Sequence, residues 1–262
     1  MNPREYLVMS ELECYHWWYR GLRDMISRIV DRYSLPNSEC LLDAGVGTGE
    51  NLAFLSKEKQ FGYVGGFDAS QVAIDLASKK VDSADLYVSD ICNPELHQDA
   101  YDIVTSCDVI NIPGLSQCFQ GLQRMVSRIR PGGLFLANLP AYSWLYSDHD
   151  LAVHTSQRFA AGQVRTMCHE LGLEPIVLTY RLCSLFPLFV LSRLPTMLFR
   201  SRSAAEARSA LSRPSKYVNS LFSTISRVEN RAIQMGWTLP WGSSVFVAAR
   251  RPLTASLREM RG

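Results

Sequence analysis

Short apolar runs alternate with helical patterns between residues 40 and 140, and this alternation constrains the fold more than any other feature of the chain. Stretches with a helical pattern lie near 50–57, 70–80 and 115–129. Strands that alternate with helices along the chain form a parallel sheet covered by helices on both faces. The segment therefore predicts an α/β fold, and its apolar runs are the expected strands: Cys40–Leu42, Tyr63–Phe67, Leu86–Val88, Ile103–Ser106 and Leu134–Asn138.

Two more strands, around 175–181 and at Ser243–Ala249, bring the predicted sheet to seven strands. About 60 residues separate them, far more than the 2–5 of a hairpin loop, and they carry helical patterns near 184–199 and 215–235. We interpret them as a helical cap inserted before the last strand. Apolar side chains at a helical period predict one N-terminal helix over about 10–33. The expected units are an N-terminal helical segment (1–36), a core (37–181), the cap (182–240), and the last strand with a tail (241–262).

Composition excludes several classes of protein. The net charge of +2 removes the usual reason to propose nucleic-acid binding. The most apolar stretch, 182–199, contains Pro187, Arg193 and Pro195 and is too broken to span a membrane, and the first residues lack the apolar core of a signal peptide. Seven cysteines without a CxxC pair predict neither a disulfide framework nor a metal site. We expect a reduced, cytoplasmic protein with no integral membrane segment.

A glycine-rich loop follows the first predicted strand, in the sequence DAGVGTGE from Asp43 to Glu50. Glycines let the backbone turn sharply and approach a ligand, and nucleotides bind at this place in doubly wound sheets. A dinucleotide site requires GxGxxG, but here Glu50 stands where the third glycine is needed. Its carboxylate would repel a diphosphate, so NAD and FAD are disfavoured.

Acidic residues end the next two predicted strands as well. Asp68 closes the second strand and can accept hydrogen bonds from both hydroxyls of a ribose. Asp90 closes the third strand, where it could accept from an adenine amino group. Together with Asp43, these acids lie at the carboxyl ends of three consecutive strands. Such a set suits a cationic nucleoside without phosphates.

The motifs, in this order, resemble those of class I S-adenosylmethionine-dependent methyltransferases. LLDAGVGTGENLAFL resembles the first motif of that family, YVGGFDAS its ribose motif and VSDI its adenine motif; YDIVTSCDVI and IRPGGLFLANLPA resemble the motifs of the fourth and fifth strands. The resemblance implies a Rossmann-like, mostly parallel sheet, S-adenosylmethionine as cofactor and S-adenosylhomocysteine as product. The family often has a Leu-Glu-His run after the fourth strand. Here residues 110–113 read INIP, so any base must come from elsewhere.

The same resemblance assigns the candidate cofactor-binding residues. The glycine loop and the acid before it would hold the methionine end of the cofactor, the acid of the second strand the ribose, and the third-strand acid with the next backbone group the adenine. Two residues at the end of the fourth strand would line the methionine channel. The full set is Asp43, Gly45, Gly47, Gly49, Asp68, Ala69, Asp90, Ile91, Ser106 and Cys107.

Two aromatic segments, Tyr15–Arg23 and 141–159, resemble a sub-group of small-molecule methyltransferases in which both flank the acceptor pocket. Rings can surround a sulfonium or a developing cation, and histidines titrate near neutrality as a base should. Packing of one helix face, or surface roles for the histidines, are the alternatives. The candidate catalytic residues are His149, His154 and Tyr19, and the candidate substrate-binding residues are His16, Trp17, Trp18, Tyr19, Arg20, Tyr142 and Tyr146.

The sequence therefore predicts a methyltransferase of a small, partly hydrophobic metabolite, with secondary metabolism as its setting. Arginines among the apolar residues of the cap are surface charges, or they meet an anionic group of the acceptor. The second interpretation keeps C-methylation of an isoprenoid diphosphate open as an alternative. A cyclase that retains the cofactor for its charge and a noncatalytic S-adenosylmethionine-binding protein are alternatives from other classes. The expected partner is a small-molecule acceptor, no nucleic acid is expected, and a homodimer is left open.

Overall fold

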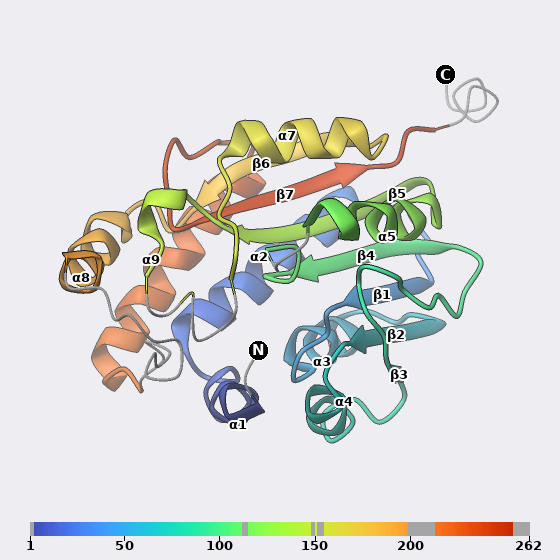
Figure 1. The fold of residues 1–262 in the computed structure, drawn as a ribbon, viewed down its shortest axis with the longest axis horizontal. Helices are drawn as coiled ribbons and strands as arrows, with labels where there is room; N and C mark the ends of the chain where they lie inside the picture. Colours follow the sequence, from blue (N-terminus) through green and yellow to red (C-terminus); the bar gives the residue numbers. More distant parts are fainter. Residues whose placement is uncertain (1–2, 112–114, 148–149, 151–154, 199–212, 254–262) are drawn as a thin grey trace.

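A seven-stranded sheet forms the centre of the computed structural model, which describes residues 3–111, 115–147, 150, 155–198 and 213–253 (Figure 1). The strand order is β3-β2-β1-β4-β5-β7-β6, and all neighbours are parallel except β7, which is antiparallel to both β5 and β6. The predicted seven-stranded, mostly parallel sheet is thereby confirmed. The strands are β1 (Cys40–Ala44), β2 (Tyr63–Asp68), β3 (Asp85–Val88), β4 (Tyr101–Cys107), β5 (Ile129–Pro140), β6 (Glu174–Arg181) and β7 (Ser244–Arg250).

Helices cover both faces of the sheet because successive strand residues point to opposite sides. Leu41 packs on one face with α2 (Trp17–Tyr33), α3 (Glu50–Glu58), α4 (Gln71–Ala77) and α9 (Lys216–Gln234). Its neighbour Leu42 packs on the other face with α5 (Leu115–Ser127) and α7 (Ala161–Glu170). Both residues are fully buried. Strands that are apolar on both faces are typical of a parallel sheet enclosed by helices.

The N-terminal segment contains two helices, so the prediction of one helix over 10–33 is wrong. The first helix, α1, is Pro3–Leu12, and the chain turns at residues 13–16 before α2 begins at Trp17. The ring of His16 caps α2, since its Nδ1 accepts a hydrogen bond from the Trp18 N–H at 3.2 Å. Glu13, in the turn, is buried and directed toward Thr48 and Lys80. Apolar residues continue at a helical spacing across the turn, so the sequence pattern did not indicate a break there.

The segment expected to be a cap contains α8 (Phe186–Leu198) and α9. Helix α9 packs closely along α2, and a Cβ on Gly21 would lie 2.2 Å from Ser226 Oγ. The Asn230 amide donates to the Gly21 carbonyl and to Asp24 Oδ2, both at 2.8 Å. Helix α9 is therefore joined to α2, so two helices that are far apart in the sequence lie side by side on one face of the sheet (Figure 1).

Three residues other than glycine adopt the left-handed conformation at one edge of the sheet. Asp108, Tyr142 and Leu182 have φ angles of 58°, 57° and 61° and follow β4, β5 and β6. These strands run in the same direction, so the three turns lie at the same edge as the glycine loop after β1. Left-handed residues other than glycine are uncommon and cluster at functional sites. The three positive φ angles therefore indicate that a functional site lies at this edge of the sheet.

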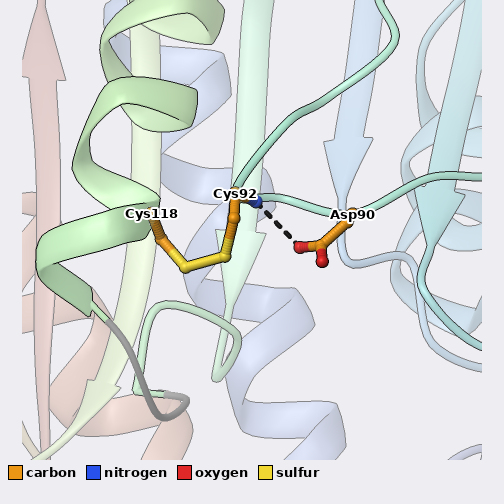
Figure 2. Close-up of a disulfide and its surroundings, with 3 residues drawn as sticks. All are labelled: Asp90, Cys92 and Cys118. Carbon is orange, nitrogen blue, oxygen red and sulfur yellow. Dashed lines mark hydrogen bonds between the residues drawn. A yellow bond between two sulfur atoms is a disulfide. The ribbon is translucent and has the colours of Figure 1, made fainter.

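A disulfide joins Cys92 to Cys118, a pair that the sequence analysis did not predict, while the other five cysteines are free (Figure 2). It connects the loop after β3 to α5. The sequence offered no signal for it, because the two cysteines are 26 residues apart and meet only when α5 packs on that loop. The contact is close: a Cβ on Gly121 of α5 would lie 2.2 Å from the Ile91 carbonyl oxygen.

No helix in the described part of the chain is long and apolar enough to cross a membrane. Within the same residues, no group of three or more His, Cys, Asp and Glu side chains is arranged to hold a metal ion.

Candidate functional site

A cavity of about 820 Å³ opens at the edge of the sheet where β1, β2, β3 and β4 end. The glycine loop and the strand-end acids line one side of it. Side chains from α2, α8 and α9 and from the segment after β5 line the other. The cavity is thus bounded by both candidate regions, the cofactor motifs and the aromatic N-terminal segment.

Asp68 receives hydrogen bonds from three groups at the cofactor side. The Gly47 N–H donates to it at 3.1 Å, the Ser70 N–H at 2.9 Å and the Tyr6 hydroxyl at 3.0 Å. Burial raises the pKa of Asp68, while these donors oppose the shift. Tyr6 comes from α1, which lies over the cofactor side and contributes Tyr6 and Met9 to the cavity. The sequence analysis did not predict this position of α1, because the contacts that α1 makes are with residues far away in the sequence.

The glycine loop approaches β4 closely. Gly45 has a φ of 83°, and a Cβ there would lie 2.1 Å from the side chain of Val109. Gly45, Gly47, Asp68, Ala69, Asp90, Ile91 and Cys107 of the predicted cofactor set all line the cavity. Asp90 is further tied to the backbone, because the Cys92 N–H donates to its carboxylate at 2.8 Å (Figure 2).

The other three residues of the predicted cofactor set do not line the cavity and instead support the loop. Asp43 accepts a hydrogen bond from Thr105 Oγ1 at 2.7 Å, and burial raises its pKa to about 7. Ser106 Oγ donates to the Ala44 carbonyl at 3.0 Å. Gly49 precedes α3 with a φ of 85°, and a Cβ there would lie 2.8 Å from Ala77.

The cofactor side is rich in carboxylates. Glu5, Glu13 and Glu50 line it together with Asp68 and Asp90. Glu13 bonds to Thr48 and Lys80, and Lys80 Nζ lies 3.7 Å from Glu50. Opposite charges attract strongly where water is partly excluded, so this set suits a cationic ligand.

Asp108 is a cavity residue that sequence reasoning missed. Both of its carboxylate oxygens lie 3.1 Å from the side-chain nitrogen Nδ2 of Asn138, which donates to them, and Asn138 Oδ1 accepts from Arg181 at 3.1 Å. Burial raises the pKa of Asp108 to about 6, with Asn138 and Arg181 opposing the shift. The signal was available: Asp108 follows the apolar run of the fourth strand, as Asp68 and Asp90 follow theirs.

The aromatic N-terminal segment supplies the acceptor side only in part. His16, Trp17, Trp18 and Tyr19 line the cavity, whereas Arg20 is exposed and not among the lining residues. Burial lowers the pKa of His16, whose Nδ1 already serves as the helix cap. Burial, and then the charges of Glu13, Asp108 and Glu5, raise the pKa of Tyr19 well above the ordinary value of a tyrosine, so the hydroxyl stays protonated. Tyr19 can therefore donate a hydrogen bond but is a poor base.

The segment after β5 contributes differently from the prediction. Tyr142 and Tyr146 are half-buried and do not line the cavity. Tyr142 stacks on Tyr180, with ring centroids 5.1 Å apart. His149 and His154 lie outside the described residues. The cavity is lined here by Ser147, Asp150, Thr155 and Arg158, for which the aperiodic sequence contained no signal.

The fold and the cavity define a class of protein: a Rossmann-like enzyme that binds a nucleoside beside a chamber for a second ligand. Residues 41–133 match the family model described as a methyltransferase domain. Residues 41–133 are therefore a methyltransferase domain, and S-adenosylmethionine is its cofactor.

Solved structures share this fold at low sequence identity. A chain of the complex between the Haloferax volcanii Trm112 methyltransferase activator and its methyltransferase has a TM-score of 0.59 and 17% identity, with 96% of this chain and 95% of that one covered. An S-adenosylmethionine-dependent methyltransferase from Clostridium acetobutylicum has a TM-score of 0.55 and 12% identity, with coverage of 89% and 92%. The [4+2]-cyclase SpnF has a TM-score of 0.55 and 14% identity, with coverage of 88% and 82%. No curated protein sequence matches the chain.

Proposed function

We propose that the enzyme methylates a small, partly apolar acceptor that binds between α2, α8 and α9. The composition of the cavity wall carries this proposal. Beyond the carboxylates of the cofactor side, apolar side chains from α2, from the turn before α8, from α8 itself and from α9 line the chamber: Trp17, Trp18, Leu22, Leu182, Leu185, Phe189, Val218 and Phe222. An apolar chamber with a few polar groups is typical of small-molecule sites.

Asp108 would accept the proton that an O–H or N–H acceptor releases on methylation. When bound, S-adenosylmethionine supplies a methyl group already activated by its sulfonium, so the protein mainly aligns the acceptor and removes that proton. A carboxyl group with a pKa of about 6 is largely ionised at neutral pH and can act as a base. Asn138 and Arg181 hold its orientation.

Asn111 offers a second polar contact for the acceptor. Its amide nitrogen donates to Thr155 Oγ1 at 3.0 Å, while its buried Oδ1 has no hydrogen-bond partner among the residues that the structure describes. A buried acceptor atom without a partner is costly, and a donor group of a ligand in the cavity would satisfy it.

Other parts of the sequence-based prediction remain proposals. Tyr19 would orient the acceptor through its hydroxyl, and His149 and His154 stay candidate bases. Methylation of an isoprenoid diphosphate, a role in secondary metabolism, a homodimer and a cytoplasmic location also stay predictions. The likeness to a [4+2]-cyclase keeps cofactor-dependent cyclisation as a second candidate.

The test is methyl transfer from methyl-labelled S-adenosylmethionine to a panel of phenols, amines, carboxylic acids and isoprenoid diphosphates. We expect label in a small-molecule product, together with S-adenosylhomocysteine. Label only in protein or nucleic acid from an extract would contradict the proposal. Conversion of an acceptor that requires the cofactor but takes up no label would favour cyclisation.

A further inference from the structure

Helix α9 has an unusual distribution of polar and apolar residues. Its buried residues are mostly polar: Ser223, Ser226, Glu229, Asn230 and Ile233. Its exposed residues include Tyr217, Leu221 and Val228, which are 89%, 57% and 62% exposed. A helix on the surface of a globular protein normally turns its apolar face toward the core and its polar face toward water. The distribution in α9 is the reverse, so an apolar face of the helix lies outside.

The exposed apolar residues of α9 form one stripe. Leu221 and Val228 follow Tyr217 at four and eleven positions, and residues at these spacings lie on the same face of a helix. The acid of this segment, Glu229, is buried and accepts from the backbone N–H groups of Cys183 and Ser184 at 3.1 and 2.6 Å. All exposed charged residues between 213 and 234 are therefore cations: Arg213, Lys216, Arg227 and Arg231.

Helix α8 shows the same reversal. It buries Arg193, whose Nη1 lies 3.0 Å from Asp150 Oδ2, while Leu188 and Leu191 are 52% and 61% exposed. Leu188 also lines the cavity, as does the exposed Val218 of α9. Both helices lie at the left of the molecule in Figure 1. Their exposed apolar surface therefore continues into the acceptor chamber.

The exposed charges discriminate between possible partners of this surface. In a dimer with a twofold axis through α9, the same patch of both copies would meet. The cations of α9 would then lie opposite each other, and like charges across an interface disfavour association. An anionic lipid surface instead attracts the cations, while the apolar face of the helix inserts at the boundary of headgroups and acyl chains.

We propose that the exposed faces of α8 and α9 dock on a membrane that contains anionic lipids, with the acceptor chamber opening toward the bilayer. Leu188, Leu191, Tyr217 and Leu221 insert into the interface, and the cations of α9 contact lipid phosphates. Because its other face is bonded to α2, α9 lies on the membrane surface and not across it. Docking goes beyond the proposed function. Entry of an amphiphilic acceptor from the lipid phase is a consequence that rests on that function.

Vesicle flotation tests the docking. The protein is mixed with vesicles of phosphatidylcholine, or with vesicles of phosphatidylcholine and phosphatidylglycerol in equal amounts. We expect binding to the mixed vesicles to be about tenfold tighter or more, because each cation near an anionic surface adds to the attraction. High salt should reduce this difference, since it screens exposed charges. Absence of binding to either kind of vesicle, or equal binding to both, would overturn the proposal.

A first variant removes part of the apolar contact. Leu191→Ser combined with Leu221→Ser changes two exposed side chains that do not line the cavity, and should weaken binding to the mixed vesicles about tenfold or more. Val88→Ser is the control and should bind like wild type. Val88 is also an exposed apolar residue, but it ends β3, at the opposite edge of the sheet from β6, which leads into α8.

A second variant removes part of the charge. Lys216→Gln combined with Arg231→Gln should weaken binding to the mixed vesicles about tenfold and leave the weaker binding to phosphatidylcholine unchanged. Circular dichroism and binding of S-adenosylhomocysteine confirm that the variants are folded. If either double variant binds the mixed vesicles as tightly as wild type, α8 and α9 are not the docking surface.

Light scattering tests the other occupant of this surface. A dimer in solution that Leu191→Ser with Leu221→Ser dissociates would assign the surface to a second copy of the chain and overturn the proposal. Because flotation reports binding and not turnover, the two proposals fail separately. A protein that binds the mixed vesicles but methylates no acceptor of the panel, in water or in vesicles, would support docking and contradict the proposed function.

Discussion

At the scale of single residues, the cofactor side depends on Asp68. Its carboxylate accepts from the glycine loop, from the start of α4 and from Tyr6 of α1, so one side chain connects three parts of the site. Because the Tyr6 hydroxyl reaches the same carboxylate that should bind the ribose, α1 and the cofactor meet at this residue. Loss of the carboxylate should therefore weaken cofactor binding.

Asp68→Ala should weaken S-adenosylmethionine binding by roughly 1–3 kcal/mol, the scale for losing hydrogen bonds to a charged acceptor. Calorimetric titration measures the change. Circular dichroism and the melting temperature serve as controls for folding. Unchanged affinity in a folded variant would remove Asp68 from the site.

Asp108→Asn tests the proposed base. Asparagine tolerates the left-handed backbone at this position, so the fold should be kept. Turnover of an O–H or N–H acceptor should fall by about 10²–10⁴, the usual contribution of a general base. The wild-type rate should rise as the pH increases through about 6, where Asp108 ionises, and the variant should lack this rise. An unchanged pH profile would assign the base to another residue.

The same variant should change stability with a definite sign. A carboxyl group whose pKa is raised on folding stabilises the protein while it is protonated, and this contribution is lost as the pH rises through about 6. The free energy of unfolding of Asp108→Asn minus that of wild type should therefore be larger at pH 8 than at pH 4. The increase should reach at most about 3 kcal/mol, the equivalent of roughly two pKa units. Urea denaturation at both pH values measures this, and a difference of the opposite sign would refute the assignment.

At the scale of secondary-structure elements, local patterns predicted the strands and the glycine loop because those patterns are short-range. The alternation of Leu41 and Leu42 between the two faces, for example, is readable over a few residues. The break between α1 and α2 was not readable, because buried Glu13 is stabilised by distant partners. The ion pairs of Asp150 were missed for the same reason, because Arg158 comes from the segment after β5 and Arg193 from α8.

The contact between α2 and α9 predicts the effect of a larger residue at Gly21. Gly21→Val would place side-chain atoms where Ser226 lies, and overpacking of this kind typically costs about 1–3 kcal/mol. Urea denaturation should show a lower midpoint than for wild type. Gly62 is the matched control, since a Cβ there would come no closer than 3.8 Å to its neighbours. Equal effects of Gly21→Val and Gly62→Val would show that the helix contact contributes little.

At the scale of the whole molecule, cofactor binding and acceptor binding involve different elements. The ends of β1, β2, β3 and β4 carry the cofactor motifs, while α2, α8 and α9 close the acceptor chamber. We therefore expect cofactor binding to depend on these strand ends and on α1, and less on α8 and α9.

S-adenosylhomocysteine should raise the melting temperature, because a ligand that binds only the folded state stabilises it by about 2.7 kcal/mol at 100 times its dissociation constant. NAD and FAD should leave the melting temperature unchanged, since Glu50 stands at the place where their pyrophosphate would need a glycine. A thermal-shift screen with all three ligands decides this. A response to a dinucleotide alone would contradict the identification of the cofactor.

The pairing of α2 with α9 also bears on how the chain is made. Helix α2 ends at Tyr33 and α9 begins at Lys216. At about 5–20 residues per second, the ribosome therefore synthesises the first residue of α9 roughly 10–40 s after the last residue of α2. The cofactor half can collapse in that interval, but the acceptor chamber cannot close before synthesis is nearly finished. Nascent chains would thus acquire their affinity for S-adenosylmethionine before they acquire a place for the molecule to be methylated.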